Sequence, residues 1–239
     1  MKDPYSSDNG GKVTDFSEIF PGQFIITEKE LDQELYELFI TEQEWIDPQP
    51  DYASLFRQGK QLSGNTIPIS KKKSILVQLA CLGTAEAYRL VQEYCTKPDP
   101  GLEEWSRIAL YECRMRLESG LLDEPVGLIS TGLGGDGERL RYIFVLALQA
   151  ECVAEEKQQE VWEALDMVCR EHRSRVEELQ FRPSYLSVQV LVPMDVAVGE
   201  VIEGSIARLN RQEERVGQNY MATNVSAPSE EEIQEFLGD

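Results

Sequence analysis

Nucleophilic and metal-assisted catalysis often depend on histidine, and this chain holds a single one, His172. A Ser-His-Asp or Cys-His site within one chain would have to use it as the base. The nearest cysteine, Cys169, falls on the apolar side of an expected helix and should point into a core. One histidine also cannot form a histidine pair around a metal ion. The sequence therefore predicts no catalytic residue of this kind, no metal site and no cofactor.

Five cysteines are spread through the chain without a CxxC pair. An odd number at wide spacing fits neither a disulfide framework nor a zinc site. We interpret them as small buried hydrophobic residues in a reducing compartment. They are Cys81, Cys95, Cys113, Cys152 and Cys169.

A glycine-rich segment, residues 130–137, reads STGLGGDG. Glycine clusters can cradle phosphate, but this one lacks the Lys-Ser/Thr of a P-loop. It also precedes an expected strand, whereas a phosphate loop follows its strand and opens a helix. We interpret residues 130–138 as a hinge between two domains.

Acidic residues dominate the chain, 43 against 23 basic ones, for a formal net charge of -20. The excess continues through residues 139–239, which hold 19 acidic and 10 basic side chains. Such a surface repels a polyanion, since phosphate binding draws on clusters of Lys and Arg. Arg170, Arg173 and Arg175 are the candidate binding residues, although they alternate with glutamates as a solvated face would. Nucleic acid is therefore a disfavoured partner.

A length of 239 residues with 41% apolar content allows one or two domains with buried cores. No apolar run approaches the roughly 18 residues of a membrane span, and the first residues lack the apolar core of a signal peptide. We therefore expect no membrane contact and a cytoplasmic location.

The first half of the chain is expected to be an acidic helical region, residues 15–129, preceded by a disordered polar tail at 1–14. Thr27 and Glu30 have capping-box spacing, which predicts a helix from there to about Phe39.

Three further helices are predicted between residues 70 and 119. Gly83 should end the first, Thr84 should cap the second, and a turn at 98–101 should precede the third. Short helices joined in this way are similar to HEAT-type repeats. A small helical bundle is the alternative, because solenoids normally need about three repeats.

The last part of the chain, residues 139–239, alternates strand and helix patterns. We expect strands at 140–148 and 181–193, a helix from 155 to about 179, a second helix at 198–209 and a final extended segment at 219–225. This order predicts the α+β class, with an antiparallel split βαβ sheet covered by helices on one face. Asp195, after the second strand, is expected to cap the helix that follows.

The same region resembles the HUH-type single-tyrosine transposases, the insertion-sequence and REP-associated kind. In that family a strand of the form Pro-Asp-His-x-His supplies two histidines that hold a divalent metal. Here Pro183 keeps the proline, Ser184 stands in place of the aspartate, and Tyr185 and Ser187 stand in place of the histidines. Tyrosine and serine are poor ligands for hard divalent cations. The resemblance implies a ferredoxin-like domain whose metal site is lost.

The family's nucleophilic tyrosine lies in a C-terminal helix, at a set interval after another tyrosine. Counted from Tyr220, that interval leads to Phe236, which has no hydroxyl. Tyr185, Ser187 and Phe236 are therefore vestigial positions, and we expect Phe236 near Ser187. The transposases dimerise by joining their sheets, so the resemblance also implies a homodimer.

Three functions remain open. The sequence favours a catalytically inactive, repurposed transposase-like protein that acts as a protein-binding or scaffold module. The first alternative is a nucleic-acid hairpin binder that no longer cleaves, and the second is an enzyme of unrelated chemistry. Charge separates the first two, because a nucleic-acid binder needs a basic stripe.

Overall fold

The computed structural model describes residues 23–47, 50–149 and 155–238 and has mixed helix and sheet, as the α+β prediction requires. The tail predicted at 1–14 and Cys152 lie outside these residues. Within them the chain divides into two compact units. We call residues 23–143 with 222–238 the helical unit and residues 144–221 the sheet unit, and each is described by itself.

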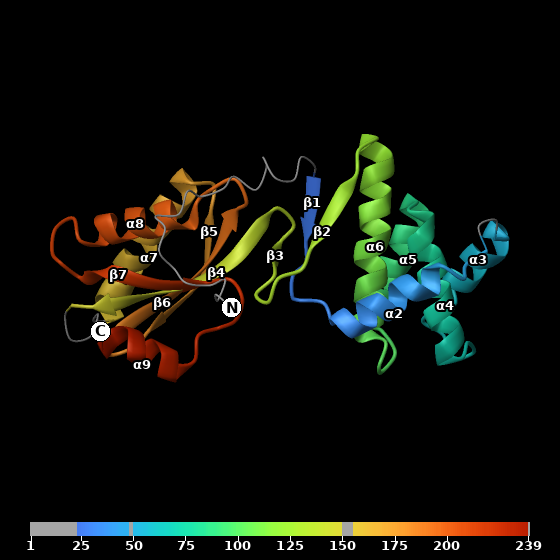
Figure 1. Ribbon diagram of the computed structural model, residues 1–239, viewed down its shortest axis with the longest axis horizontal. Helices are drawn as coiled ribbons and strands as arrows, with labels where there is room; N and C mark the ends of the chain where they lie inside the picture. Colours follow the sequence, from blue (N-terminus) through green and yellow to red (C-terminus); the bar gives the residue numbers. More distant parts are fainter. Residues whose placement is uncertain (1–22, 48–49, 150–154, 239) are drawn as a thin grey trace, which may run out of the picture. The chain divides into compact units, whose positions relative to one another are not determined.

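Five helices and a two-stranded parallel sheet form most of the helical unit (Figure 1). The two strands were not predicted, and they pair the start of the acidic region with its end, Ile26 opposite Ile129. The elements are β1 (Gln23–Ile26), α2 (Gln33–Gln43), α3 (Tyr52–Gly59), α4 (Ile69–Leu82), α5 (Ala85–Cys95), α6 (Glu103–Leu122) and β2 (Val126–Ile129).

The start of α2 differs from the prediction. Asp32, not Thr27, caps it, because the Asp32 carboxylate accepts a hydrogen bond from the Leu35 N–H at 2.9 Å. The Thr27 N–H instead donates to the Ile129 carbonyl at 2.9 Å and continues the β1–β2 pairing. The capping-box pattern at Thr27 is thus overridden by a strand partner far along the chain.

The junction of α4 and α5 follows the sequence signals. Gly83 ends α4 in the left-handed region at φ 55°, and the Thr84 hydroxyl accepts the N–H of Ala87 at the start of α5. A Cβ at Gly83 would lie 2.7 Å from the Cβ of Arg116, so the junction also packs tightly against α6.

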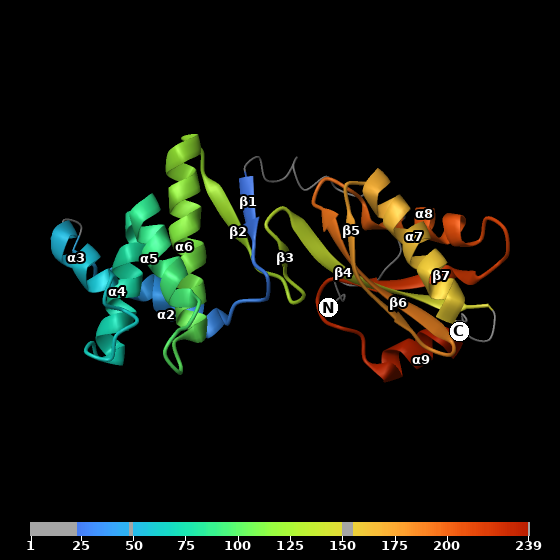
Figure 2. The ribbon, with the colours of Figure 1, turned by 180° about the vertical axis from the view of Figure 1, so that it is seen from behind.

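The helical unit has one hydrophobic core. Helices α4, α5 and α6 contact one another, and α2 contacts both α4 and α6 (Figure 2). Phe39 of α2 packs on Trp105 of α6, with ring centroids 5.1 Å apart. The fully buried members of this core include Phe39, Ile75, Leu76, Leu79, Ala80, Val91, Tyr94, Ile108, Ala109 and Cys113.

The glycine-rich segment is packed and hydrogen-bonded within the helical unit. It contains β3 (Gly135–Asp136), and the Gly135 N–H donates to the Thr27 carbonyl at 2.7 Å. A Cβ at Gly132 would overlap the carbonyl oxygen of Val225, and one at Gly134 would overlap that of Glu28. These glycines are therefore explained by close backbone approach, and the boundary between the units falls at 143–144, inside β4, not at residues 130–138.

The sheet unit is built from four strands and two helices, with β3 pairing only the first residues of β4. Strand order is β7-β4-β6-β5. Their bounds are β4 (Arg139–Leu148), α7 (Glu155–Glu171), β5 (Arg175–Phe181), β6 (Tyr185–Pro193), α8 (Val198–Leu209) and β7 (Val216–Thr223).

Neighbouring strands in this sheet run antiparallel. The register of β5 and β6 is antiparallel, with Phe181 opposite Leu186. Leu148, at the end of β4, donates its N–H to the carbonyl of Ser184, just before β6. Gln149 donates likewise to Arg215, just before β7. The end of β4 therefore lies beside the starts of both neighbours.

Helix α7 is shorter than predicted, ending at Glu171 instead of near Leu179. Arg173 adopts φ 55°, and the Ser174 N–H turns back to the carbonyl of Cys169 at 2.7 Å. Residues 175–181 then pair with β6, because strand pairing satisfies their backbone groups and buries Val176. The last helix, α9 (Glu230–Gly238), starts with a reciprocal Ser229–Glu232 capping box.

No helix in the described ranges is long and apolar enough to cross a membrane.

Candidate functional site

The positions aligned with the transposase metal ligands lie on β6. Tyr185 and Ser187 are two residues apart and share one face of the strand. Tyr185 is buried and Ser187 is half-buried, while Leu186 and Val188 fill the opposite face. Across the described residues there is no group of three or more histidine, cysteine or carboxylate side chains that could hold a metal ion. This face offers the Tyr185 phenol and the Ser187 hydroxyl.

Phe236, aligned with the nucleophilic tyrosine, lies half-buried on α9. It belongs to the helical unit and Ser187 to the sheet unit. Their proximity therefore stays a prediction.

Each of the three candidate arginines has a carboxylate partner. Arg170 lies 2.8 Å from Asp166 one turn earlier on α7, and Arg175 lies 3.8 Å from Glu177. Arg173 forms its ion pair with Asp195. Asp195 is therefore not the cap predicted for α8, whose N-cap residue, Ala197, makes no side-chain hydrogen bond. These cations are neutralised locally, as on a solvated face.

The sole histidine faces a carboxylate. His172 Nδ1 lies 4.0 Å from Glu200 Oε2. Burial raises the pKa of the Cys169 thiol to about 12 and that of Cys113 likewise to about 12, so neither forms a thiolate near neutral pH. Burial also raises the pKa of Cys81 and Cys95. These four thiols behave as small hydrophobic groups, as the sequence predicted.

The burial of one lysine was not predicted from the sequence. Lys72 of α4 is 1% exposed, and its ammonium pairs with the Asp99 carboxylate. Tyr94 Oη donates to the same carboxylate oxygen at 2.7 Å. Lys72 and then Tyr94 lower the pKa of Asp99, while burial is the main cause that raises the pKa of Tyr94 to about 12. The ammonium is therefore held as one half of an ion pair and joins α4 to the turn after α5.

A second polar cluster lies beneath α2. Glu112 of α6 is 1% exposed, and its carboxylate accepts hydrogen bonds from Tyr36 Oη at 2.7 Å and Gln43 Nε2 at 3.3 Å. Arg116 lies 3.8 Å from the same carboxylate and donates to Gln43 Oε1 at 2.7 Å. Burial, followed by the Glu112 contact, raises the pKa of Tyr36. This cluster fixes two turns of α2 against α6.

The solvent side of α2 carries large apolar side chains among carboxylates. Leu38 is 57% exposed, and Trp45, in the turn that follows α2, is 84% exposed. Trp45 follows the last residue of α2 by two positions, and its N–H donates to the Glu42 carbonyl at 3.3 Å. We define the α2 face as Leu38 and Trp45 with the exposed carboxylates Glu34, Glu37 and Glu42. It contains no basic residue.

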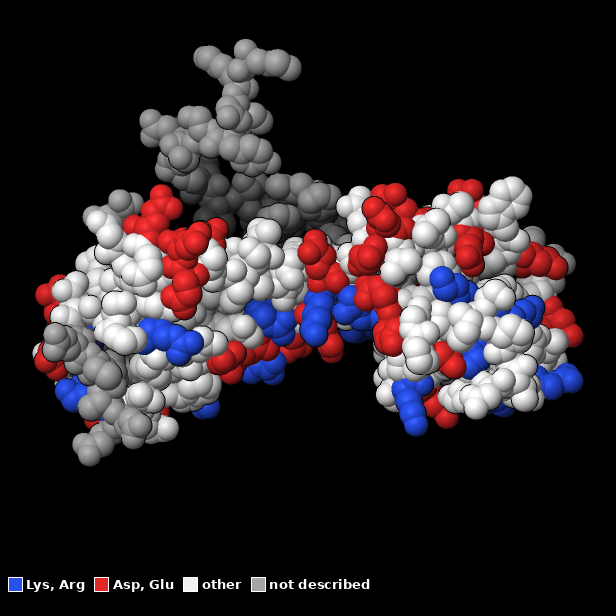
Figure 3. Space-filling model, turned by 90° about the horizontal axis from the view of Figure 1, so that it is seen from below, with Lys and Arg blue, Asp and Glu red and all other residues white. Residues whose placement is uncertain are grey.

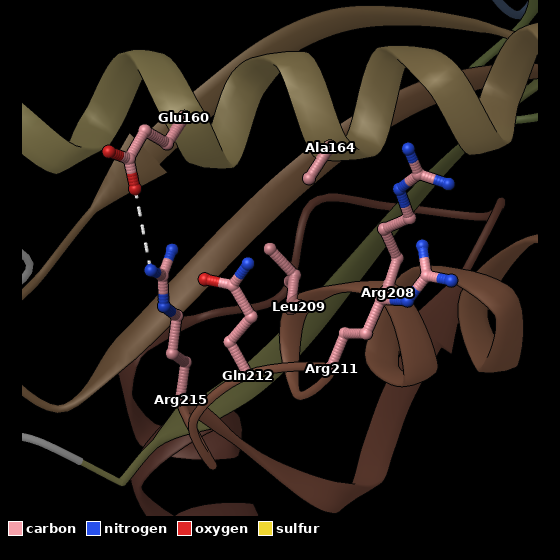
Figure 4. Close-up of a pocket in the computed structure, with 7 residues that line it drawn as sticks. All are labelled: Glu160, Ala164, Arg208, Leu209, Arg211, Gln212 and Arg215. Carbon is pink, nitrogen blue, oxygen red and sulfur yellow. Dashed lines mark hydrogen bonds and ion pairs between the residues drawn. The ribbon is translucent and has the colours of Figure 1, made fainter.

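Charges of both signs are mixed on the surface seen in Figure 3, where lysines and arginines of both units lie among carboxylates. One exception belongs to the sheet unit, where Arg208, Arg211 and Arg215 line a single pocket (Figure 4). Their spacing of three and four residues is visible in the sequence, but no binding site was predicted from it.

Comparison with known proteins gives a limited result. No family model and no curated protein matches the sequence. Among solved structures, the chain is similar to a crystal structure described as that of a putative transposase from Deinococcus radiodurans R1. The two share 12% sequence identity with a TM-score of 0.38, over 42% of this chain and 89% of the other.

The Lys72–Asp99 pair predicts a specific dependence of stability on pH. A carboxyl whose pKa is lowered by folding stabilises the fold above its ordinary pKa of 3.8, and this contribution is lost as the pH falls through the folded value. Lys72→Met removes the main cause of the shift. The free energy of unfolding of wild type minus that of the variant should therefore be more positive at about pH 7 than at about pH 3.

Urea unfolding at several pH values measures this difference. The prediction concerns the pH dependence alone, because a buried ion pair replaced by an apolar group can gain or lose stability overall. Lys97→Met, at an exposed position, is the matched control and should give a nearly pH-independent difference. If the difference in unfolding free energy between wild type and Lys72→Met were the same at both pH values, the prediction would be contradicted.

Proposed function

We propose that the protein is a non-catalytic protein-binding module of the cytoplasm, and that the α2 face binds a basic segment of a partner protein. The observation that carries the proposal is the exposure of Leu38 on α2 and of Trp45 in the turn after it, at 57% and 84%, where the exposed charges of the helix are all acidic. Tryptophan is enriched among the residues that dominate binding energy at interfaces.

Charge defines the chemistry of the partner. Glu34, Glu37 and Glu42 surround the two apolar side chains, so a complementary segment carries lysines or arginines. The partner segment therefore carries apolar side chains for Leu38 and Trp45, flanked by positive charge.

Rigidity supports the same assignment. The Glu112 cluster ties Tyr36 and Gln43 of α2 to α6, on the side opposite the α2 face. A binding helix that is held before the partner arrives loses less conformational entropy on association. The buried network thus prepares the face for binding.

For the sheet unit we propose a ferredoxin-like, transposase-like scaffold without transposase chemistry. The strand order β7-β4-β6-β5, with α7 and α8 as the connecting helices, supports the first part. Tyr185 and Ser187 at the aligned metal positions and Phe236 at the aligned nucleophile support the second. For the helical unit, mutual contact among α4, α5 and α6 favours a small bundle over a HEAT-type repeat.

Substitutions on the α2 face should weaken binding of the partner protein. Trp45→Ala combined with Leu38→Ala should weaken binding by about thirtyfold or more, since hot-spot truncations cost about 2 kcal/mol or more. The measurement is affinity purification from the native cells after nuclease treatment, with partners quantified by mass spectrometry and then titrated as purified proteins. Leu121→Ala, at an exposed leucine of α6, is the control.

The partner's charge gives a second arm of the same test. Replacing Glu34, Glu37 and Glu42 together by glutamine should slow association and flatten its dependence on salt. A partner that binds the glutamine variant and the wild type alike, at every salt concentration, would contradict a basic segment.

The protein should not cleave single-stranded DNA hairpins. Incubation with Mg²⁺ or Mn²⁺ should give neither a nicked strand nor a covalent protein–DNA product, because the aligned positions supply no histidine pair and no tyrosine nucleophile. A covalent product from the natural sequence would overturn the non-catalytic assignment. A hairpin dissociation constant below about 1 μM at about 150 mM salt, measured by anisotropy, would favour a nucleic-acid binder instead.

We further propose a homodimer that joins the β7 edges of two sheets. Strand β7 contains no charged residue, whereas β5, at the other edge, carries Arg175, Glu177 and Glu178 and a register shift beside Val176. Charges and bulges protect an edge from pairing, so within the described residues β7 is the edge better suited to pair with a second copy. Light scattering at micromolar concentration should give about twice the 27.1 kDa monomer mass, and Asn219→Lys should lower it. A monomer mass for the wild type would contradict the proposal.

A further inference from the structure

The sheet unit contains a pocket of about 240 Å³ between α7 and the loop that joins α8 to β7 (Figure 4). Helix α7 supplies Glu160 and Ala164, and the end of α8 with its loop supplies the other side. We call it the arginine pocket, and its lining residues are Glu160, Ala164, Arg208, Leu209, Arg211, Gln212 and Arg215. We propose that the arginine pocket binds the phosphate group of a small phosphorylated molecule.

The loop that carries these arginines is held in shape by Asn210. Its side-chain oxygen accepts the N–H groups of Arg215 at 2.8 Å and Val216 at 3.0 Å. Its side-chain amide donates to the Val216 carbonyl at 2.8 Å. One asparagine therefore closes the loop from both ends, and the positions of Arg211 and Arg215 are set by the fold before any ligand binds.

Positive charge in the pocket is only partly balanced. Its single carboxylate is Glu160, which lies 3.4 Å from Arg215 Nη2 and is itself largely exposed. Arg208 Nη2 lies 2.7 Å from the Met167 sulfur, a weak acceptor. Among the described residues no ion pair joins Arg208 or Arg211 to a carboxylate. In the same loop, Glu213 faces Lys157 at 3.9 Å.

The hydrogen-bond donors of Arg215 are not all used by protein acceptors. A guanidinium offers five N–H donors. Its Nε is buried without a hydrogen-bond partner, and its one acceptor is the Glu160 oxygen at 3.4 Å. A phosphate oxygen at the pocket would give this guanidinium the paired, charge-assisted contact that Arg prefers.

The favourable charge at the end of a helix explains the position of one of the three arginines but not of the other two. Arg208 lies in the last turn of α8, where a cation interacts favourably with the exposed carbonyl groups. Arg211 and Arg215 follow the end of the helix, so this effect does not explain them. All three arginines line one pocket, with Arg208 and Arg211 on one side of Leu209 and Arg215 on the other (Figure 4).

The volume and lining of the arginine pocket indicate which kind of phosphorylated molecule fits it. A volume of about 240 Å³ exceeds that of one phosphate ion, and Leu209 and Ala164 add apolar surface beside the arginines. The ligand is therefore a phosphate group attached to a small organic part, with the phosphate at the arginines and the carbon skeleton against Leu209. Inorganic phosphate should bind through the same arginines, more weakly.

The test titrates the full-length protein with inorganic phosphate and with glycerol phosphate, followed by NMR chemical shifts or calorimetry at about 150 mM NaCl. We expect saturable binding of both, tighter for glycerol phosphate. Arg211→Gln and Arg215→Gln should each weaken it by about tenfold or more, the loss of roughly one charge-assisted contact. Arg182→Gln, at an exposed arginine outside the pocket, should leave it unchanged.

Ala164→Leu keeps every charge and narrows the pocket, so it should weaken glycerol phosphate more than inorganic phosphate. This variant keeps the proposal testable if an arginine variant fails to fold, which circular dichroism would reveal. Absence of saturable binding up to about 10 mM ligand would overturn the proposal. An equal loss with Arg182→Gln would also overturn it, as would hairpin DNA binding through these arginines without any binding of the two small phosphates.

Discussion

A buried carboxylate determines where α2 lies. Glu112 is almost without solvent, and an ionised carboxylate in that position costs several kcal/mol of desolvation unless partners compensate it. Tyr36 and Gln43 supply hydrogen bonds from α2, and Arg116 adds charge from α6 itself. Any rotation of α2 about its axis would separate these groups. The polar contacts on one side of α2 therefore help to keep Leu38 on the solvent side of the same helix.

Local signals predicted part of the fold well. Gly83 and Thr84 end one helix and begin the next through contacts within a few residues, and these contacts are present. The start of α2 and the end of α7 were wrong, because in both places the backbone pairs with another strand. The Thr27 N–H bonds to the Ile129 carbonyl, far along the chain, and residues 175–181 pair with β6, the next strand in sequence. Helix propensity and capping patterns carry no information about such partners.

The candidate sites divide in the same way. Arg170 pairs with Asp166 one turn earlier, which helix spacing could foresee, but Arg173 pairs with Asp195 from beyond β6. The arginine pocket forms only because α7 and the α8–β7 loop lie side by side in the fold. The sequence shows no more than three arginines within eight residues. Trp45 was visible as an aromatic residue, while its exposure depends on the packing of Phe39 and Ile40 beneath α2.

Strand β4 passes from one compact unit into the other, and the chain returns at residues 221–222. The helical unit is therefore discontinuous in sequence, with residues 144–221 between its two parts. Residues 222–238, including Val225 against Gly132, reach the helical unit only after residues 144–221 have been synthesised. Ribosomal synthesis thus imposes an order in which residues 144–221 can fold before the last residues complete the helical unit.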